Sequence, residues 1–132
     1  MEKIILASGP VIVEDGRVML NQHGDTTFWK FCGGKAERFQ ENLIETAKRE
    51  VKEEMGIDIE ILDEEPYIFF TRQEKETELI DVILVHFLAK RIGEIELGED
   101  ITDWQWFELD KLPENLAPNI LPTLKYFKFI KE

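Results

Sequence analysis

Cysteine is almost absent from this sequence, since Cys32 is the single one among 132 residues. One thiol forms no internal disulfide, and this usage is compatible with the reducing cytoplasm. Long apolar runs are absent too, because no stretch approaches the roughly 18 apolar residues of a membrane-spanning helix. The N-terminal segment lacks the basic region that begins a secretory signal. We therefore expect a cytoplasmic protein that has no membrane partner.

Basic residues are also few, with 16 Lys and Arg against 28 Asp and Glu and a formal net charge of -12. A surface of this sign does not displace the counterions of DNA or RNA, so we expect no nucleic-acid partner. An acidic protein nevertheless acts on polyphosphates when bound cations reverse the charge of its site. Most of the other surface carboxylates are expected only to keep the chain soluble.

Hydrophobic residues make up 43% of the chain and charged residues 33%, which is typical of a soluble globular protein rather than a disordered one. The length fits one domain. No internal repeat, low-complexity tract or linker interrupts the sequence, so we predict a single domain over residues 1–132.

The pattern of apolar residues predicts strands mixed with two helices. Apolar segments on either side of Asp15-Gly16 predict a β-hairpin. The strands are predicted at 3–8, 10–13, 17–20, 28–31, 57–62, 66–71, 79–90 and 104–107. The longest, 79–90, is expected to be central, and a helix is predicted over 119–130 with Pro122 near its first turn. These elements favour an α/β fold in which helices pack on a mixed sheet.

The other helix, predicted over residues 42–55, is the most informative segment. Asn42 is its expected N-cap, and Glu45 three positions later completes a capping box. Gly56 stands where helices commonly end in a left-handed residue. The predicted helix has about 14 residues and is roughly 20 Å long.

Three glutamates share one face of this helix. At about 100° per residue, Glu50, Glu53 and Glu54 fall within about a third of the circumference. The apolar stripe beside them consists of Ile44, Ala47, Val51 and Met55. When this stripe docks on the sheet, the carboxylates are expected at the edge of the interface, facing the loop that carries Gly33 and Gly34.

A cation explains why such a face would exist. Like charges this close repel, and a hard divalent cation such as Mg²⁺ with oxygen ligands removes the conflict. The paired glycines bring bare backbone close and offer carbonyls to a metal or N–H groups to a phosphate. A lone Glu-x-x-Glu-Glu is more often a solvated acidic face, but the whole constellation is far less expected by chance. Arg49 points away from Glu54 and is expected to orient the site by pairing with Glu41 or Glu45.

The segment Gly34–Ile57 resembles the Nudix box: Gly, five residues, Glu, seven residues, Arg-Glu, an apolar residue, any residue, Glu-Glu, any residue, Gly and an apolar residue. The match is complete from Glu41 to Ile57. Six residues separate Gly34 from Glu41, one more than usual, and we expect the extra residue to bulge outward and leave the metal site intact. The Asp-Gly hairpin, Trp29 and the segment 106–112 also look like Nudix features, so the resemblance covers nearly the whole chain.

The resemblance implies an α/β/α sandwich with a central mixed β-sheet. It also implies hydrolysis, by water, of the diphosphate linkage in a nucleoside diphosphate derivative: a nucleoside triphosphate, a dinucleoside polyphosphate or a nucleotide sugar. Mg²⁺ is the expected cofactor, with Mn²⁺ as an alternative. By box position, the metal ligands are Glu50, Glu53, Glu54 and a backbone carbonyl in the Gly34 region. Either Glu50 or Glu53 is the general base, and Arg49 is counted with the catalytic residues for its orienting role.

The sequence defines the substrate contacts least well. Lys35, Arg72 and Asp100 are candidates, and Glu99 or Asp100 is either a further acid of the site or a plain loop acid. The aromatic residues that would stack on a base, although each is more often a core residue, are Phe28, Trp29, Tyr67, Phe69 and Phe70. His23 is a candidate polar group of a ligand loop, and His86 is expected to be a satisfied sheet residue.

Two further questions stay open from the sequence. The alternative function is a non-catalytic nucleotide-binding regulatory module on the same fold. The complete set of box carboxylates favours the enzyme.

The chain is expected to be a monomer or a homodimer that binds a small-molecule nucleotide. Cys32 has no evident base partner, so a thiol nucleophile is rejected.

Overall fold

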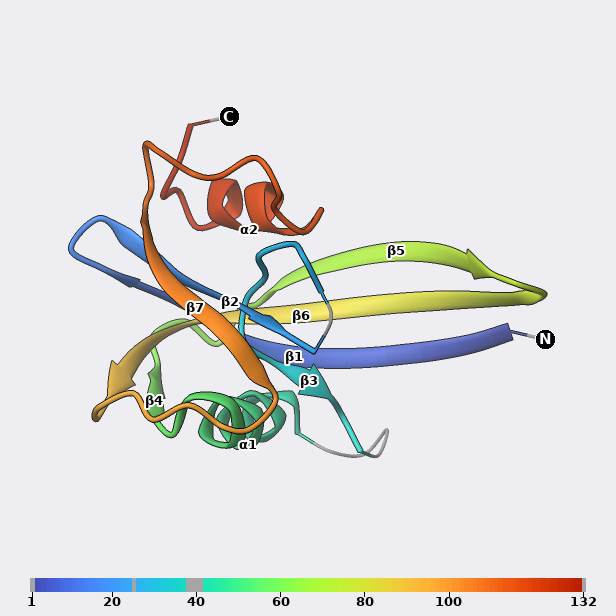
Figure 1. Ribbon diagram of the computed structural model, residues 1–132, viewed down its shortest axis with the longest axis horizontal. Coiled ribbons are helices and arrows are strands. Elements are labelled where there is room, and N and C mark those ends of the chain that lie inside the picture. The colour runs from blue at the N-terminus through green and yellow to red at the C-terminus, as the bar shows by residue number, and fades with distance from the viewer. Residues whose placement is uncertain (1, 25, 38–41, 132) are drawn as a thin grey trace.

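The computed structural model describes residues 2–24, 26–37 and 42–131. Figure 1 shows a sheet with one helix on each side. In chain order the elements are β1 (Glu2–Glu14), β2 (Arg17–His23), β3 (Gly34–Lys35), α1 (Leu43–Met55), β4 (Asp58–Ile61), β5 (Tyr67–Lys75), β6 (Glu78–Ile92), β7 (Ile101–Glu108) and α2 (Ile120–Tyr126).

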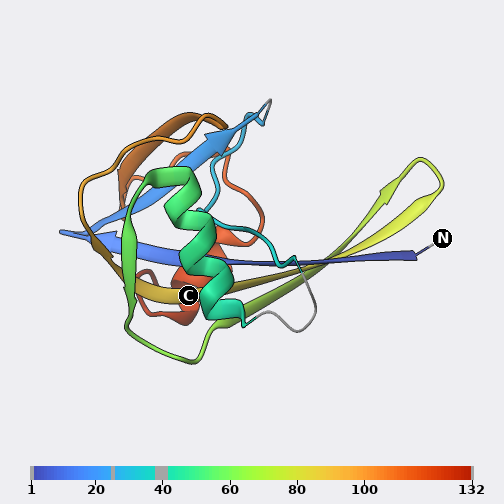
Figure 2. The same ribbon diagram turned by 90° about the horizontal axis from the view of Figure 1, so that it is seen from below.

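The sheet is mixed, with the strand order β4-β6-β1-β2-β7. β1 and β6 run parallel, whereas the other pairings in the sheet are antiparallel. β3 lies beside β1, and β5 pairs with β6. β6 therefore contacts three strands, which confirms the prediction that the apolar segment 79–90 is central. Figure 2 shows that the outer ends of β1, β5 and β6 project from the body of the molecule.

The β1–β2 hairpin confirms the prediction made from Asp15-Gly16. Val13 lies opposite Val18 across the turn. Asp15 has φ 51° and Gly16 has φ 75°. Positive φ at both central residues is the geometry that matches the right-handed twist of a two-residue hairpin.

Side chains of β1 and β2 alternate between two apolar layers, as the period of a strand requires. Ile12 and Met19 face α1, whereas Val11, Val18 and Leu20 face α2. The α1 layer also contains Ala47, Val51, Met55, Ile57, Ile59, Ala89 and Ile101. The α2 layer also contains Trp29, Phe31, Ala117, Ile120 and Leu124. The predicted α/β/α sandwich around a mixed sheet is therefore confirmed (Figure 1).

α1 begins and ends where its caps predict. The Asn42 side chain accepts hydrogen bonds from the backbone N–H groups of Ile44 (2.8 Å) and Glu45 (3.3 Å). Gly56 is left-handed, with φ 71°, and its N–H donates to the Lys52 carbonyl. The Glu45 carboxylate, predicted to complete a capping box, lies 4.0 Å from the Lys48 ammonium.

α2 is shorter than predicted. It ends at Tyr126 rather than near residue 130, although Pro122 does lie in its first turn. Lys128 has φ 66°, and the Phe129 N–H donates to the Leu124 carbonyl at 2.9 Å. This hydrogen bond is typical of a helix that ends in a left-handed residue. In the described part of the chain, no helix has the length and apolar character to cross a bilayer.

The segment 28–31 is not a regular strand, in contrast to the prediction. It forms isolated bridges, in which Lys30 pairs with Asn21 and Trp29 pairs with Leu116. The segment thus ties the end of β2 to the stretch that leads into α2. It delivers the chain to Gly33 and β3, beside the carboxylates of α1.

Candidate active site

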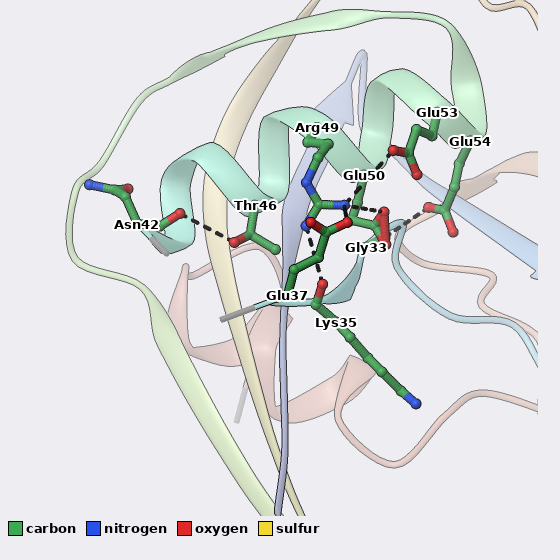
Figure 3. Close-up of polar contacts among 9 residues, drawn as sticks. All are labelled: Gly33, Lys35, Glu37, Asn42, Thr46, Arg49, Glu50, Glu53 and Glu54. Atoms are coloured by element: carbon green, nitrogen blue, oxygen red, sulfur yellow. Dashed lines mark hydrogen bonds and ion pairs between the residues drawn. The ribbon is translucent and has the colours of Figure 1, made fainter. Parts of the chain in front are cut away.

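α1 presents the three box carboxylates along its C-terminal half, beside the strand that carries the glycines (Figure 3). Burial of Ala47 and Val51 fixes the rotation of the helix on the sheet. The Glu50 side chain is 17% exposed and that of Glu53 is 61% exposed. The predicted helix face therefore lies at the edge of the helix–sheet interface, with Glu50 turned inward.

The paired glycines allow the backbone to approach these carboxylates. The Gly33 N–H donates to Glu54 Oε1 at 2.9 Å. A Cβ on Gly34 would overlap the Glu50 carboxylate. Gly33 has φ 148°, and a Cβ there would press on the Ser8 carbonyl. Side chains at these two positions would therefore separate β3 from α1 or disturb its pairing with β1.

Arg49 connects α1 to β3. Its Nη1 lies 3.2 Å from Glu50 Oε2 and 3.8 Å from Glu53 Oε1, and its Nη2 donates to the Lys35 carbonyl at 3.3 Å. Glu37 lies 3.6 Å from the same guanidinium. The predicted partner Glu45 pairs with a lysine instead, as described above. The other predicted partner, residue 41, lies outside the described residues.

The electrostatics of the site leave negative charge uncompensated. Burial raises the pKa of Glu54 to about 7, and the charge of Glu50 adds to the effect, against the Gly33 N–H and the Lys30 ammonium. Burial also raises the pKa of Glu50, together with a hydrogen bond to the Glu53 carboxyl. Both shifts have the direction expected for carboxyls held close together out of water.

The loop between β6 and β7 brings two acids, Glu99 and Asp100, to the box carboxylates. The N–H groups of Glu96 and Gly98 donate to the carbonyls of Met55 and Glu54, each at 2.8 Å. These carbonyls belong to the last turn of α1, which has no helical partners for them. A Cβ on Gly98 would overlap the Glu53 carbonyl, so the loop needs glycine there.

The result is an acidic cavity of about 290 Å³. Its wall combines the box carboxylates with the acids of the β6–β7 loop and with Gly33 and β3. The lining residues are His23, Gly33, Gly34, Lys35, Glu50, Glu53, Glu54, Glu99, Asp100 and Ile101. The structure therefore brings two of the predicted substrate residues, Lys35 and Asp100, to the box carboxylates.

The donor set of this cavity fits a hard divalent cation. It offers carboxylate oxygens and a glycine backbone that no side chain shields, which is the chemistry Mg²⁺ and Mn²⁺ take. Among the described residues, no three acidic, His or Cys side chains form a ready cage. Glu54 is held by Gly33 and Glu50 by Arg49. Each of these bonds uses one carboxylate oxygen and leaves the other oxygen for a cation.

A second, largely apolar cavity of about 420 Å³ adjoins the acidic one. The two cavities share the wall formed by His23, Gly33, Gly34 and Lys35. Of the aromatic residues predicted to meet a base, Phe28 and Phe69 line the apolar cavity. The others lie elsewhere: Trp29 packs on Phe107, Tyr67 packs on Tyr126, and Phe70 is exposed away from the cavity.

His86 is buried as predicted, but it also faces the apolar cavity. Its ring packs against Phe31 with centroids 4.9 Å apart. Burial lowers its pKa to about 4, so the imidazole is neutral near pH 7. A neutral ring next to an apolar wall suits an uncharged group such as a nucleobase.

Two residues of the apolar cavity were missed by the sequence reasoning. Lys30 and Asn119 both line it. Asn119 is only 3% exposed, and its side chain does not cap α2. The available signal was weak: a single lysine among aromatic residues, and an asparagine just before a predicted helix.

Arg72 is placed away from both cavities. Its guanidinium binds Asp81 through two contacts of 2.6 and 3.1 Å. On β5, the residues that line the apolar cavity are Phe69, Thr71 and Gln73. Because successive side chains of a strand alternate in direction, Arg72 points to the opposite face of the sheet.

A mixed sheet between two helices, with a carboxylate-bearing helix held against a double-glycine segment, defines the Nudix class of fold. The model of the NUDIX domain matches residues 5–127, so the chain belongs to the Nudix family. Members of this family generally use divalent metal ions, and membership supports hydrolysis of a pyrophosphate linkage in nucleotide derivatives in general.

Solved structures of Nudix proteins match along nearly the whole chain. A MutT Nudix hydrolase from Burkholderia pseudomallei is 25% identical with a TM-score of 0.74, over 93% of this chain and 97% of that one. A MutT protein from Methanosarcina mazei Go1 is 25% identical with a TM-score of 0.72, over 96% and 94% of the two chains. An ADP-ribose pyrophosphatase from Streptococcus suis, at 22% identity, TM-score 0.66 and coverage of 92% and 87%, shows the shared fold. No match was found among curated proteins.

Proposed function

We propose that this protein is a Mg²⁺-dependent hydrolase, with Mn²⁺ as an alternative metal, that cleaves the diphosphate linkage of a nucleoside diphosphate derivative with water. The observation that carries this proposal is the shared wall of the two cavities. A nucleoside in the apolar cavity would extend its phosphates past Gly33 and Gly34 toward the carboxylates of α1. The chemistry of the two cavities therefore matches the two ends of such a substrate.

The metal would be held by Glu50, Glu53, Glu54 and the Gly34 carbonyl. When bound, it neutralises phosphate charge and lowers the pKa of a coordinated water. The charge balance of the site supports this assignment, since the pKa values of Glu50 and Glu54 are raised by burial and by neighbouring carboxylates.

Glu50 is our candidate for the group that takes the proton from the attacking water. Its side chain is turned inward beside the backbone of Gly34, where the phosphates would pass. Arg49 fixes this carboxylate at 3.2 Å while it also holds the Lys35 carbonyl. Arg49 is therefore a positioning residue. Asp100 and Glu99 line the same cavity, where they are suited to a second cation or to the attacking water.

The apolar cavity is our candidate for nucleobase binding. Phe28 and Phe69 offer stacking surfaces at its wall. The Asn119 side chain, which makes no cap bond, brings one acceptor and two donors to the edge of a base. Neutral His86 adds a further polar contact that carries no charge.

Incubation with a panel of nucleoside triphosphates, dinucleoside polyphosphates and nucleotide sugars, with Mg²⁺, with Mn²⁺ and with EDTA, tests the proposal. We expect cleavage of at least one substrate with metal and none in EDTA, and incorporation of ¹⁸O from labelled water into a phosphate product. The double substitution Glu53→Gln with Glu54→Gln should reduce turnover by at least about a thousandfold, because it removes two metal ligands.

Glu60→Gln, an exposed change on β4, is the matched control and should leave turnover unchanged. Turnover that survives the double substitution would show that the mechanism is wrong. Tight nucleotide binding without turnover of any substrate would instead favour the non-catalytic regulatory module.

A further inference from the structure

Lys30 stands where the two cavities meet. Its Nζ lies 2.7 Å from His23 Nε2. His23 lines both cavities, and Lys30 itself lines the apolar one. The ammonium group is therefore located at the passage between the proposed base site and the proposed metal site.

The surroundings of Lys30 leave it suited to bind an anion. Burial lowers its pKa, while the nearby Glu54 charge acts in the opposite direction. An ammonium has three N–H donors. His23 Nε2 accepts one of them, and within the described part of the chain the ammonium donates to no other acceptor. Two donors of a partly desolvated cation are thus available to a ligand that enters the passage.

We infer that Lys30 binds an oxygen of the phosphate group next to the nucleoside, and that His23 holds its ammonium in place. This inference rests on the proposed function, because it supposes that one nucleotide spans both cavities. A ligand that occupies the two sites must pass His23 and the glycines at their shared wall. The first group beyond the nucleoside is a phosphate, and a charge-assisted hydrogen bond to its oxygen is about twice as strong as a neutral one.

Two other roles of Lys30 make different predictions. A lysine that reads the base would contribute equally to the binding of a nucleoside and of its nucleotide. A lysine that only offsets the charge of Glu54 would contribute to neither, and its removal would mainly change metal affinity. A phosphate-binding lysine affects the nucleotide alone.

The test compares the four common ribonucleoside 5′-monophosphates with their nucleosides by calorimetric titration of the metal-free protein in EDTA. We expect Lys30→Met to weaken the tightest monophosphate by about tenfold and to leave the affinity for its nucleoside unchanged. Lys30→Arg, which keeps the charge, should retain most of the monophosphate affinity. Lys90→Met, on the exposed side of β6, is the matched control and should change neither.

A loss of equal size for nucleoside and monophosphate, an unchanged monophosphate affinity, the same loss in Lys90→Met, or no monophosphate binding to the parent protein would each overturn the inference. Unchanged nucleoside affinity also shows that Lys30→Met is folded. In parallel, Mn²⁺ affinity should stay within about threefold in Lys30→Met, since Lys30 does not ligate the metal in this scheme.

These outcomes separate the inference from the proposed function. A protein that hydrolyses no nucleotide but shows the selective loss would disprove the hydrolysis and support the role of Lys30. A protein that hydrolyses nucleotides, with Lys30→Met unchanged in binding, would disprove the role of Lys30 alone. In an active enzyme, Lys30→Met should raise KM by about tenfold and change kcat by less, because the contact is already made in the bound substrate.

Discussion

Gly33 and Gly34 occupy adjacent positions, but their side-chain hydrogens face different neighbours. At Gly34 the missing Cβ leaves room for the end of the Glu50 side chain, which can rotate away. At Gly33 the missing Cβ leaves room for the Ser8 backbone, which cannot move aside. Gly33 also has a φ of 148°, a conformation that residues with a side chain rarely adopt. We therefore expect Gly34 to matter mainly for function and Gly33 mainly for folding.

Gly34→Ala should consequently reduce metal-dependent turnover by about a hundredfold while it lowers the free energy of unfolding by less than about 1 kcal/mol. Gly33→Ala should lower that free energy by about 2 kcal/mol or more, because it adds backbone strain to a steric clash. Urea unfolding and turnover measured on both variants check this contrast. Equal losses of stability in the two variants would contradict it.

The Glu54 carboxyl gives the metal-free protein a pH dependence of known sign. Its pKa rises from 4.5 to about 7 in the folded state, mainly through burial. The folded protein therefore holds this proton more tightly than the unfolded chain does. The favourable contribution is complete below pH 4.5 and is lost as the pH rises through about 7.

Glu54→Gln removes this titration, so the metal-free variant should be more stable than the parent protein at pH 8, by up to about 3 kcal/mol. At pH 5.5 the gain should be much smaller. Urea unfolding in EDTA at both pH values measures it, with Glu60→Gln as a control that should show no such difference. A gain that does not grow with pH would mean that the fold does not raise the pKa of Glu54.

At the residue scale, the sequence allowed the box carboxylates and the glycines to be predicted because their spacing on one helix and one loop is local. The positions of Lys30 and Asn119 at the apolar cavity were not predictable in the same way, because they depend on neighbours from distant segments. Arg72 shows the opposite case. It was a reasonable phosphate candidate until the pairing of β5 with β6 placed it opposite Asp81.

At the scale of elements, α1 was predicted almost residue by residue, whereas α2 was not. The limits of α1 are set by Asn42 and Gly56, whose preferences are strong and local. The end of α2 depends on Lys128 in a left-handed conformation, which no residue preference of lysine indicates. The segment 28–31 has the composition of a strand, but it lies between β2 and the chain before α2 and pairs only at single residues.

Lys128→Gly should therefore stabilise the protein by about 0.5–1 kcal/mol, since glycine adopts positive φ without the cost that a Cβ brings. Lys125→Gly is the matched change inside the last turn of α2, and it should destabilise by about 1 kcal/mol because glycine weakens a helix interior. Thermal unfolding of both variants gives the comparison. A loss of stability in Lys128→Gly would show that the left-handed closure is absent in solution.

At the scale of the whole molecule, the class of fold followed from the mixture of strand and helix patterns. The strand order did not, because the parallel pairing of β1 with β6 joins segments about 80 residues apart. An apolar segment indicates a buried strand, but it does not indicate which strand pairs with it. The apolar cavity, which is formed by several such segments, was for that reason beyond sequence reasoning.

The net charge of -12 and the unneutralised carboxylates predict that cations stabilise the whole fold. At a Mg²⁺ concentration 100 times the dissociation constant, linkage gives a gain of about 2.7 kcal/mol and a higher Tm. The double substitution Glu53→Gln with Glu54→Gln should abolish most of this gain, whereas Glu60→Gln should keep it. Differential scanning calorimetry with Mg²⁺ and with EDTA measures the effect, and an equal gain in the double variant would point to non-specific screening.

The attachment of the β6–β7 loop to the end of α1 also limits how the chain can vary in length. Through Glu96 and Gly98 this loop is hydrogen-bonded to the same helix turn that bears Glu53 and Glu54, so the backbone holds its acids in register with those of the helix. An inserted residue between 93 and 98 would shift the acids against each other, although the segment lies on the surface. The loop before β5, whose residues 63–65 are exposed, has no such tie to α1 and would accept an insertion or a fused tag far more readily.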